Sequence, residues 1–316
     1  MKNFSWLLNR DVLAAICATP ILLSTASAFA DEMPAAEAVT AVPAAEAPKE
    51  PVPDWTYTFN LGLYSEYMFR GVSLTDGPAI QGGFDIGHSS GFYAGTWWSN
   101  LDPYYNGQVD RVDADPTAAP PVDFAPARKG NHIESDWYLG YAHTFENGLG
   151  VNFLGNYYVY VEGRNIGTGS TKDTENSFEA SVAISYKFLT YTYYRVLTDY
   201  YGADATLDDF TAIKDGNTKG ADYHELKVNY TLPIGDLNFM TKVGYQNTRH
   251  ILGDQGDFAI GLNRNFSFPS AGKPIEGFNA GAYYTHTFDV QNQGFYTSNG
   301  RDVNQDSIWF YLKRTW

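Results

Sequence analysis

The chain has little cysteine, little positive charge and no long hydrophobic segment outside its N-terminus. Its one cysteine, Cys17, lies in the N-terminal segment, so we expect the rest of the protein to contain no disulfide. The 21 basic and 36 acidic residues give a net charge of −15, which argues against a nucleic-acid partner because Lys and Arg make most phosphate contacts. Beyond the N-terminus no stretch approaches the ~20 apolar residues of a membrane-spanning helix. If this protein crosses a membrane, we expect it to do so as a barrel.

The first 30 residues have the pattern of a secretory signal peptide. A basic start is followed by the apolar residues 12–23 and by small residues that end at Ala30, where we expect cleavage. Ile16 precedes Cys17, whereas bacterial lipidation sites have a small residue there, so we do not expect a lipoprotein. Residues 31–53 consist mainly of Ala, Pro and Glu without apolar periodicity. They predict a disordered or polyproline linker on the periplasmic side.

Residues 55–69 alternate with a period of two and predict the first strand. Large aromatic residues near both ends of its apolar face indicate the two interfaces of a bilayer. The chain also has 24 Tyr, 20 Phe and 30 Gly, a composition typical of barrels in which every second residue faces lipid. The apolar face carries Trp55, Tyr57, Phe59, Leu61, Leu63, Tyr67 and Phe69.

We count about twelve strands by the same pattern and predict an all-β fold, a transmembrane antiparallel barrel over residues 54–316. An even number of strands brings the C-terminus back to the periplasm, the side from which the linker starts. The predicted strands are 55–69, 79–88, 91–99, 133–145, 149–161, 177–187, 189–198, 222–232, 236–247, 257–266, 277–288 and 306–316.

The connections alternate in length, as in outer-membrane barrels with short periplasmic turns and long extracellular loops. The short ones are 89–90, 146–148, the region of Phe188, 233–235 and 268–274. The long ones are 71–78, 100–132, 162–176, 199–221, 248–256 and 289–305.

The last strand alternates through Ile308, Phe310 and Leu312 and ends on Trp316. A terminal aromatic residue on such a strand is the usual signal for the outer-membrane assembly machinery, so we expect Trp316 to serve as that signal. The other partners we expect are outer-membrane lipid, lipopolysaccharide and small hydrophilic solutes, with no cofactor.

Residues 60–102 resemble the TorF family, a conserved proteobacterial family of unknown function whose members are regarded as porins. The matching pieces include Ser65-Glu66-Tyr67, Phe69-Arg70-Gly71-Val72-Ser73 and Gln81-Gly82-Gly83-Phe84-Asp85, and looser matches extend through most of the barrel. The loop 102–132 is longer than expected for the family, and Trp316 stands where Phe is commoner. The resemblance implies an outer-membrane barrel and, by inference, passive transport.

Charged residues on the polar face of the strands are the candidates for the pore lining. Glu66 and Arg70 share this face of the first predicted strand, ~13 Å apart along it, so we expect each to bond to neighbouring strands. They form part of a constriction or of a network that makes the wall rigid, and the sequence supports the two interpretations equally. The remaining candidates are Asp85, Glu134, Asp136, Glu179, Lys187, Arg195, Glu225, Lys227, Lys242 and Lys313.

The balance of these charges and the acidic loops predict a porin for small hydrophilic solutes with a weak preference for cations. Acidic residues at the extracellular mouth would attract cations, and they include Asp110, Asp113, Asp115, Asp208 and Asp209. Residues 110–115 could also bind Ca²⁺, but a solvated acidic loop is the favoured interpretation because the Gly and the closing Glu of an EF-hand are missing.

Two other function classes remain open. The first is a non-conducting barrel that binds other surfaces through its long loops. The second, less favoured, is an outer-membrane hydrolase, since the six His residues have no accompanying nucleophile motif. We therefore predict a protein that is not an enzyme.

Overall fold

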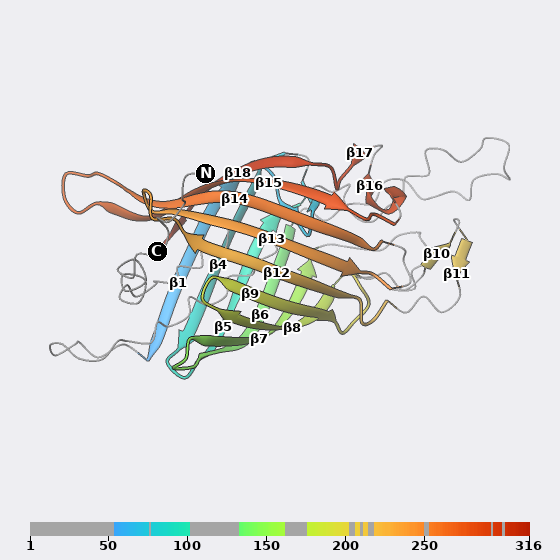
Figure 1. The fold of residues 1–316 in the computed structure, drawn as a ribbon, viewed down its shortest axis with the longest axis horizontal. Helices are drawn as coiled ribbons and strands as arrows, with labels where there is room; N and C mark the ends of the chain where they lie inside the picture. Colours follow the sequence, from blue (N-terminus) through green and yellow to red (C-terminus); the bar gives the residue numbers. More distant parts are fainter. Residues whose placement is uncertain are drawn as a thin grey trace, which may run out of the picture.

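Twelve antiparallel strands form a closed barrel, as the alternation predicts (Figure 1). The computed structural model describes residues 54–75, 77–101, 133–161, 176–201, 206–208, 211–213, 218–249, 253–291, 293–298 and 301–316. Around the barrel the strands follow the order β1-β18-β15-β14-β13-β12-β9-β8-β7-β6-β5-β4. Their bounds are β1 (Trp55–Tyr64), β4 (Ala79–His88), β5 (Phe92–Asn100), β6 (Ile133–Thr144), β7 (Leu149–Tyr160), β8 (Ser177–Tyr186), β9 (Leu189–Val196), β12 (Asp222–Thr231), β13 (Leu237–Asn247), β14 (Gln255–Phe268), β15 (Ile275–Phe288) and β18 (Ser307–Thr315).

The first and last strands close the ring. β1 pairs with β18 from Asn60↔Thr315 to Tyr64↔Tyr311, and with β4 along its whole length. The N–H of Trp316 also donates to the carbonyl of Phe59 at 2.8 Å. Closure pairs the first strand with the last, which is what allows a sheet to lie in lipid.

Six short strands of the described residues are not hydrogen-bonded into the ring: β2 (Met68–Phe69), β3 (Val72–Ser73), β10 (Thr206–Asp208), β11 (Thr211–Ile213), β16 (Thr297–Ser298) and β17 (Arg301–Asp302). Each pairs with its neighbour in the chain. In Figure 1 the pairs β10–β11 and β16–β17 lie at one end of the molecule, and the C-terminus lies towards the other. The 3₁₀ helix η1 covers Gln293–Tyr296. Within the described residues, no helix has the length and apolarity needed to span a bilayer.

The two faces of the barrel differ as the alternation predicts. On β1 the outward residues Trp55, Tyr57, Phe59, Leu61 and Leu63 are all exposed. The same holds around the ring, where large apolar side chains account for most of the outer face. Charged and amide side chains on the opposite parity of the strands are buried inside.

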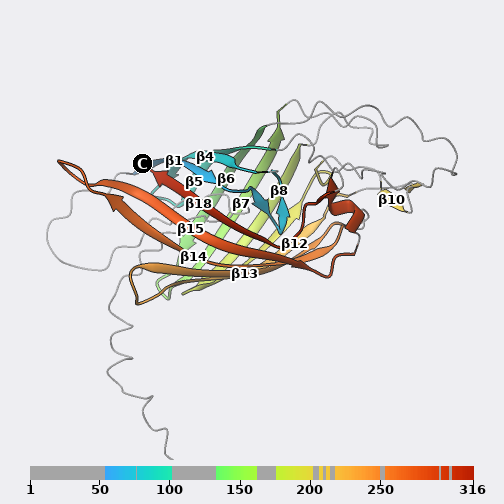
Figure 2. The ribbon, with the colours of Figure 1, turned by 90° about the horizontal axis from the view of Figure 1, so that it is seen from above.

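The first predicted strand is too long. β1 ends at Tyr64, and the chain then turns into the barrel before β4 begins at Ala79. Tyr67 and Phe69 therefore do not belong to the outer apolar face. They are buried in the interior, with exposed fractions of 1% and 9%. The connection expected to extend outward as a loop, residues 71–78, begins inside the barrel, and Figure 2 shows the short blue arrows of this segment among the strands.

Candidate functional site

A short hairpin crosses the interior of the barrel. We call residues 66–75 the inner hairpin. β2 and β3 pair within it as Met68↔Ser73 and Phe69↔Val72, joined by Arg70 and Gly71. Both turn residues have positive φ, 45° and 79°, as a two-residue hairpin turn of this hand requires. Glycine is needed at the second position for space as well, because a Cβ there would lie 2.6 Å from Cγ2 of Thr287 on β15.

The tip of the inner hairpin reaches the wall opposite β1. Nη2 of Arg70 donates to both carboxylate oxygens of Glu179 on β8, at 2.8 and 3.0 Å, and Nη1 donates to Oε1 of Gln246 on β13, at 2.9 Å. The carbonyl of Arg70 accepts a hydrogen bond from Nε2 of Gln255 on β14 at 3.0 Å. Arg70 is 4% exposed and Glu179 is 3% exposed. An ion pair this far from water, with charge-assisted hydrogen bonds to both carboxylate oxygens, is held by charge and by geometry together.

Aromatic rings cover the faces of the same guanidinium. Its Cζ lies 4.4 Å from the ring centre of Tyr223 on β12 and 4.9 Å from that of Tyr194 on β9. The ring of Phe69, from the hairpin itself, lies 4.9 Å away. Cation–π contacts of this length are strongest where water is excluded, as it is here.

The side of the hairpin nearer to β5–β7 is also packed against the wall. The hydroxyl of Tyr67 donates to Oε2 of Glu134 at 3.1 Å, and its ring lies edge-on against Trp97. Phe69 makes edge contacts with Tyr158 and Tyr201. Burial, and next the charge of Glu134, raise the pKa of Tyr67 well above its usual value, so this phenol stays protonated and remains a donor.

Hydrogen bonds hold the base of the hairpin. Glu66 accepts from Ser73 at 2.5 Å and from Ser307 at the start of β18. The N–H of Ser73 donates to the carbonyl of Val303 at 2.7 Å, and that of Tyr67 donates to Oγ1 of Thr75 at 2.9 Å. The inner hairpin thus contacts most of the strands of the ring and lies across the interior.

Two inward carboxylates on β6 lie side by side. Glu134 is 1% exposed and accepts hydrogen bonds from the hydroxyls of Tyr67 and Tyr160, at 3.1 and 3.4 Å. Asp136 accepts from Nδ2 of Asn156 on β7 at 3.3 Å, while its other oxygen has no hydrogen-bond partner among the described residues. Neither forms an ion pair with a described basic residue. This part of the interior therefore holds two carboxyl groups without a compensating cation among the described residues.

In the wall formed by β12–β14, a buried lysine balances the charge of two carboxylates. Nζ of Lys242 lies 3.4 Å from Oε2 of Glu225 and 3.5 Å from Oδ2 of Asp257. Lys227 approaches the other oxygen of Glu225 at 3.9 Å. Tyr223 donates to Oδ1 of Asp257 at 2.7 Å, which joins this network to the ring that covers Arg70.

Most of the candidate residues for the pore lining lie inside the barrel. Arg70 contacts the far wall rather than the strands beside β1, and Glu66 and Arg70 are not on one strand. Those on the inward parity of the strands are Asp85, Glu134, Asp136, Glu179, Glu225, Lys227 and Lys242.

Two of the candidates for the pore lining are placed elsewhere by the structure. Lys187 is exposed in the turn between β8 and β9, where its φ of 57° marks the reversal of the chain. Arg195 lies on the outward parity of β9, with 42% of its side chain exposed, beside Tyr193 and Asp222. Lys187 was predicted wrongly because the turn, and not the strand, sets the direction of its side chain. Arg195 was predicted wrongly because it has the same parity as Leu189 and Tyr191, which face outward.

Several predicted residues lie outside the described part of the chain or at its margin. Asp110, Asp113, Asp115 and Asp209 lie outside the described residues, as do the predicted signal peptide and linker, and Asp208 is the last residue of β10. Trp316 follows β18, where its ring lies 5.4 Å from that of Phe59 and 4.6 Å from Cζ of Arg314.

Three of the residues that surround Arg70, namely Tyr194, Tyr223 and Gln246, were not predicted from the sequence. Tyr223 and Gln246 share the inward parity of their strands with Glu225 and Lys242, so the alternation could have placed these two inside. No local pattern could have shown that the three residues meet, because they come from three strands and contact a hairpin more than 120 residues earlier in the chain.

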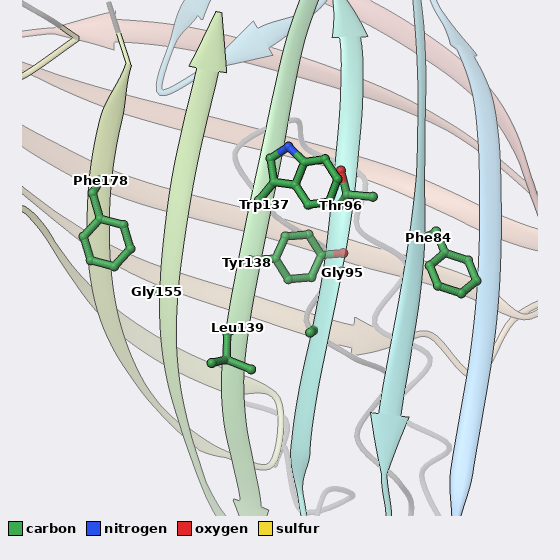
Figure 3. A pocket seen from close by; sticks show the side chains of 9 residues that line it. Phe84, Gly95, Thr96, Trp137, Tyr138, Leu139, Gly155 and Phe178 are labelled. Carbon is green, nitrogen blue, oxygen red and sulfur yellow. The ribbon is translucent and has the colours of Figure 1, made fainter.

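A hollow of about 430 Å³ on the outer face is separate from the interior (Figure 3). Outward side chains of β4, β6 and β8 form its walls, namely Phe84, Trp137, Leu139 and Phe178, and small residues such as Ala94 and Gly155 leave room between them. Its lining is mainly apolar, as expected of a surface that contacts acyl chains. Among the described residues no group of three or more His, Cys, Asp or Glu could hold a metal ion.

A closed antiparallel barrel with an apolar outer face and a charged interior belongs to the class of transmembrane β-barrels. Residues 48–316 match the model of a family described as "Bacterial protein of unknown function (Gcw_chp)", and the chain belongs to that family. The TorF name stays a prediction. No curated protein sequence matches the chain.

Solved porin structures are similar to this chain at low sequence identity. A KdgM porin has 6% sequence identity and a TM-score of 0.43, over 82% of this chain and 98% of that one. OccK5 (OpdH) of Pseudomonas aeruginosa has 14% identity and a TM-score of 0.35, over 84% of this chain and 67% of the other. OccAB2 of Acinetobacter baumannii has 11% identity and a TM-score of 0.36, over 85% and 66%.

Proposed function

We propose that this protein is a channel of the Gram-negative outer membrane through which small hydrophilic solutes and ions diffuse passively, and that the inner hairpin closes it in the conformation described. The observation that carries the proposal is the charged interior enclosed by an apolar outer face. Burying charged groups in a static core is costly, whereas a lumen that admits water and solutes uses them. Among the described connections, the inner hairpin is the one that crosses the interior, so it would have to move.

A weak preference for cations follows from the charge of the interior. The buried strand carboxylates among the described residues are Asp85, Glu134, Asp136, Glu179, Glu225 and Asp257, whereas the buried cations are Lys242 on a strand and Arg70 on the hairpin. If the hairpin withdrew, Arg70 would leave and the excess of negative charge would grow. This source of selectivity is independent of the acidic loops that the sequence predicts at the mouth.

The dense interior favours one alternative function, a non-conducting barrel that acts through its outer loops. Besides the hairpin, Tyr283, Trp309 and Tyr311 stack inside at ring distances of 4.9 and 6.0 Å, and Tyr64 lies 5.3 Å from Tyr311. Such a stack fills the space along β1, β18 and β15. A barrel with no passage would still display long loops.

Planar-bilayer recording distinguishes the two functions. The unmodified protein is compared with a variant in which a short Gly-Ser linker replaces residues 66–75, after a gel-mobility shift on heating has shown that both are folded. We expect rare or small openings from the first and steady conductance from the second. If neither conducts, the porin proposal fails and the surface-binding alternative is supported.

A further inference from the structure

We propose that the barrel wall facing the hairpin tip is a binding site for guanidinium groups, and that Arg70 occupies it as a tethered competitor of free guanidinium-bearing solutes. The site is formed by Glu179, Tyr194, Tyr223 and Gln246, and we call it the guanidinium site. The inference rests on the proposed function where it concerns transport: it names the class of solute, small alkylguanidines and arginine-like molecules, that would displace the hairpin and enter the channel.

The acceptors of the guanidinium site are arranged to match the coplanar N–H donors of a guanidinium group. Three hydrogen bonds reach the two terminal nitrogens of Arg70, two from Nη2 to Glu179 and one from Nη1 to Gln246, all between 2.8 and 3.0 Å. A guanidinium presents its donors in one rigid plane, whereas an ammonium is a compact point charge with three donors on a tetrahedron. The wall therefore discriminates in favour of guanidinium over ammonium.

Aromatic rings of the wall also match the flat faces of the guanidinium group. Tyr194 and Tyr223 place their rings 4.9 and 4.4 Å from the guanidinium carbon, which suits a flat cation. Both rings come from adjacent strands of the wall, β9 and β12. A solute with a planar cationic end gains the same contacts.

The wall holds these groups by bonds that do not involve the hairpin. Tyr223 donates to Asp257 at 2.7 Å, Tyr158 donates to Glu179 at 3.3 Å, and Nε2 of Gln246 donates to the carbonyl of Asp222 at 2.8 Å. Acceptors and rings fixed in this way stay in position when their ligand leaves. Only the guanidinium and the ring of Phe69 belong to the hairpin, so the site persists without them.

The tether sets the concentration at which a free solute competes. A group held by a short flexible segment has an effective concentration on the order of millimolar, and a solute must reach this range to displace it. We therefore expect simple alkylguanidines to displace Arg70 in the millimolar range. That is a concentration range suited to a channel, from which the solute must also leave.

The first experiment removes the competitor. Purified Arg70→Ala protein in detergent is titrated with N-ethylguanidinium by calorimetry, with N-ethylammonium as the matched ligand. We expect N-ethylguanidinium to bind at least tenfold more tightly than N-ethylammonium. Adding Glu179→Gln to the variant should weaken N-ethylguanidinium binding at least tenfold, whereas adding Asp85→Asn, which changes a buried carboxylate of β4, should leave it within twofold.

Equal binding of the two ligands, no binding, or no effect of Glu179→Gln would each overturn the guanidinium site. Calorimetry does not require an open channel, so a failure of the porin proposal leaves this result interpretable. A conducting protein whose Arg70→Ala variant does not bind N-ethylguanidinium would retain the porin function and reject the site.

A second measurement uses the unmodified protein and does not depend on the folding of a variant. Hydrogen–deuterium exchange of residues 67–75 is followed with 50 mM L-arginine or 50 mM L-lysine. Displacement of the hairpin should raise the exchange rate several-fold with arginine and leave it unchanged with lysine. An unchanged rate with both solutes, or an equal rise with both, contradicts competition at the guanidinium site.

Discussion

Nη2 of Arg70 lies 2.8 Å from Oε1 and 3.0 Å from Oε2 of Glu179, although the two residues are 109 positions apart in the chain. The bond joins the tip of the inner hairpin, which follows β1, to β8 on the other side of the barrel. Both side chains are buried, so the pair is screened little by salt. The pair therefore holds the tip of the hairpin against β8, and four predictions follow from this pair and from the seam and charges around it.

Glu179→Gln should release the inner hairpin. Removing one partner of a buried ion pair costs about 3–5 kcal/mol because the remaining charge is left uncompensated, and Arg70 can avoid this cost by moving into water. We expect a larger open fraction in planar-bilayer recordings. The control is Asp85→Asn, a buried carboxylate that accepts from Thr58 and Tyr138 rather than from the hairpin. Equal behaviour of the two variants would show that the pair does not hold the hairpin.

Gly71→Ala should prevent the tip from seating against the wall. The added Cβ would lie 2.6 Å from Cγ2 of Thr287 and 2.8 Å from Cβ of Asp257, at a φ of 79° that disfavours side chains. Faster amide exchange of residues 67–75 and greater conductance are the expected results. Gly77→Ala is a matched control, because Gly77 also has positive φ but a Cβ added there would have nothing within 4 Å. Exchange that rises equally in both variants would point to backbone strain instead.

The double variant Glu134→Gln with Asp136→Asn should reduce the preference for cations. These inward carboxyl groups have no ion-pair partner among the described residues, so in their ionised form their field acts on ions in the lumen. The reversal potential under a KCl gradient measures the effect. The double substitution is made in the variant whose residues 66–75 are replaced by a Gly-Ser linker, because that variant is expected to conduct. Asp208→Asn with Asp209→Asn tests the mouth-charge mechanism in the same assay. That mechanism predicts an effect that shrinks as salt rises, since exposed charges are screened within ~10 Å at 0.1 M.

Deletion of Trp316 should lower the amount of assembled protein. Its backbone makes two hydrogen bonds with Phe59, at 2.8 and 3.3 Å, that extend the seam between β18 and β1, and its ring packs on Phe59. Trp316→Phe keeps both bonds and an aromatic ring, so we expect normal levels from it. The folded fraction in outer-membrane preparations, read from the gel-mobility shift on heating, checks both variants. Normal levels of the deleted form would show that assembly does not depend on this residue.

The alternation of the strands predicted the fold closely. Eleven of the twelve predicted strands match the observed ones to within two residues at each end, as for residues 79–88 and β4. Strand parity is a local property, since one face meets lipid and the other meets the interior, and a sequence therefore records it directly. The exception, residues 55–69, keeps the same alternation beyond Tyr64 although the chain has left the wall. Tyr67 and Phe69 are apolar because they pack inside the barrel, and periodicity cannot distinguish that burial from contact with lipid.

The sequence by itself determined that this protein is a barrel, how many strands it has and, for most positions of the strands, which side chains face inward. Only the tertiary structure decided what the inward residues do. Arg70 was identified from the sequence as a charged residue of the interior, but its partners come from four strands separated from it by more than 100 residues, and their meeting depends on the closure and size of the ring. A contact across a barrel leaves no local pattern in the chain, because nothing in the spacing of residues along the strands specifies which part of the opposite wall a hairpin will reach.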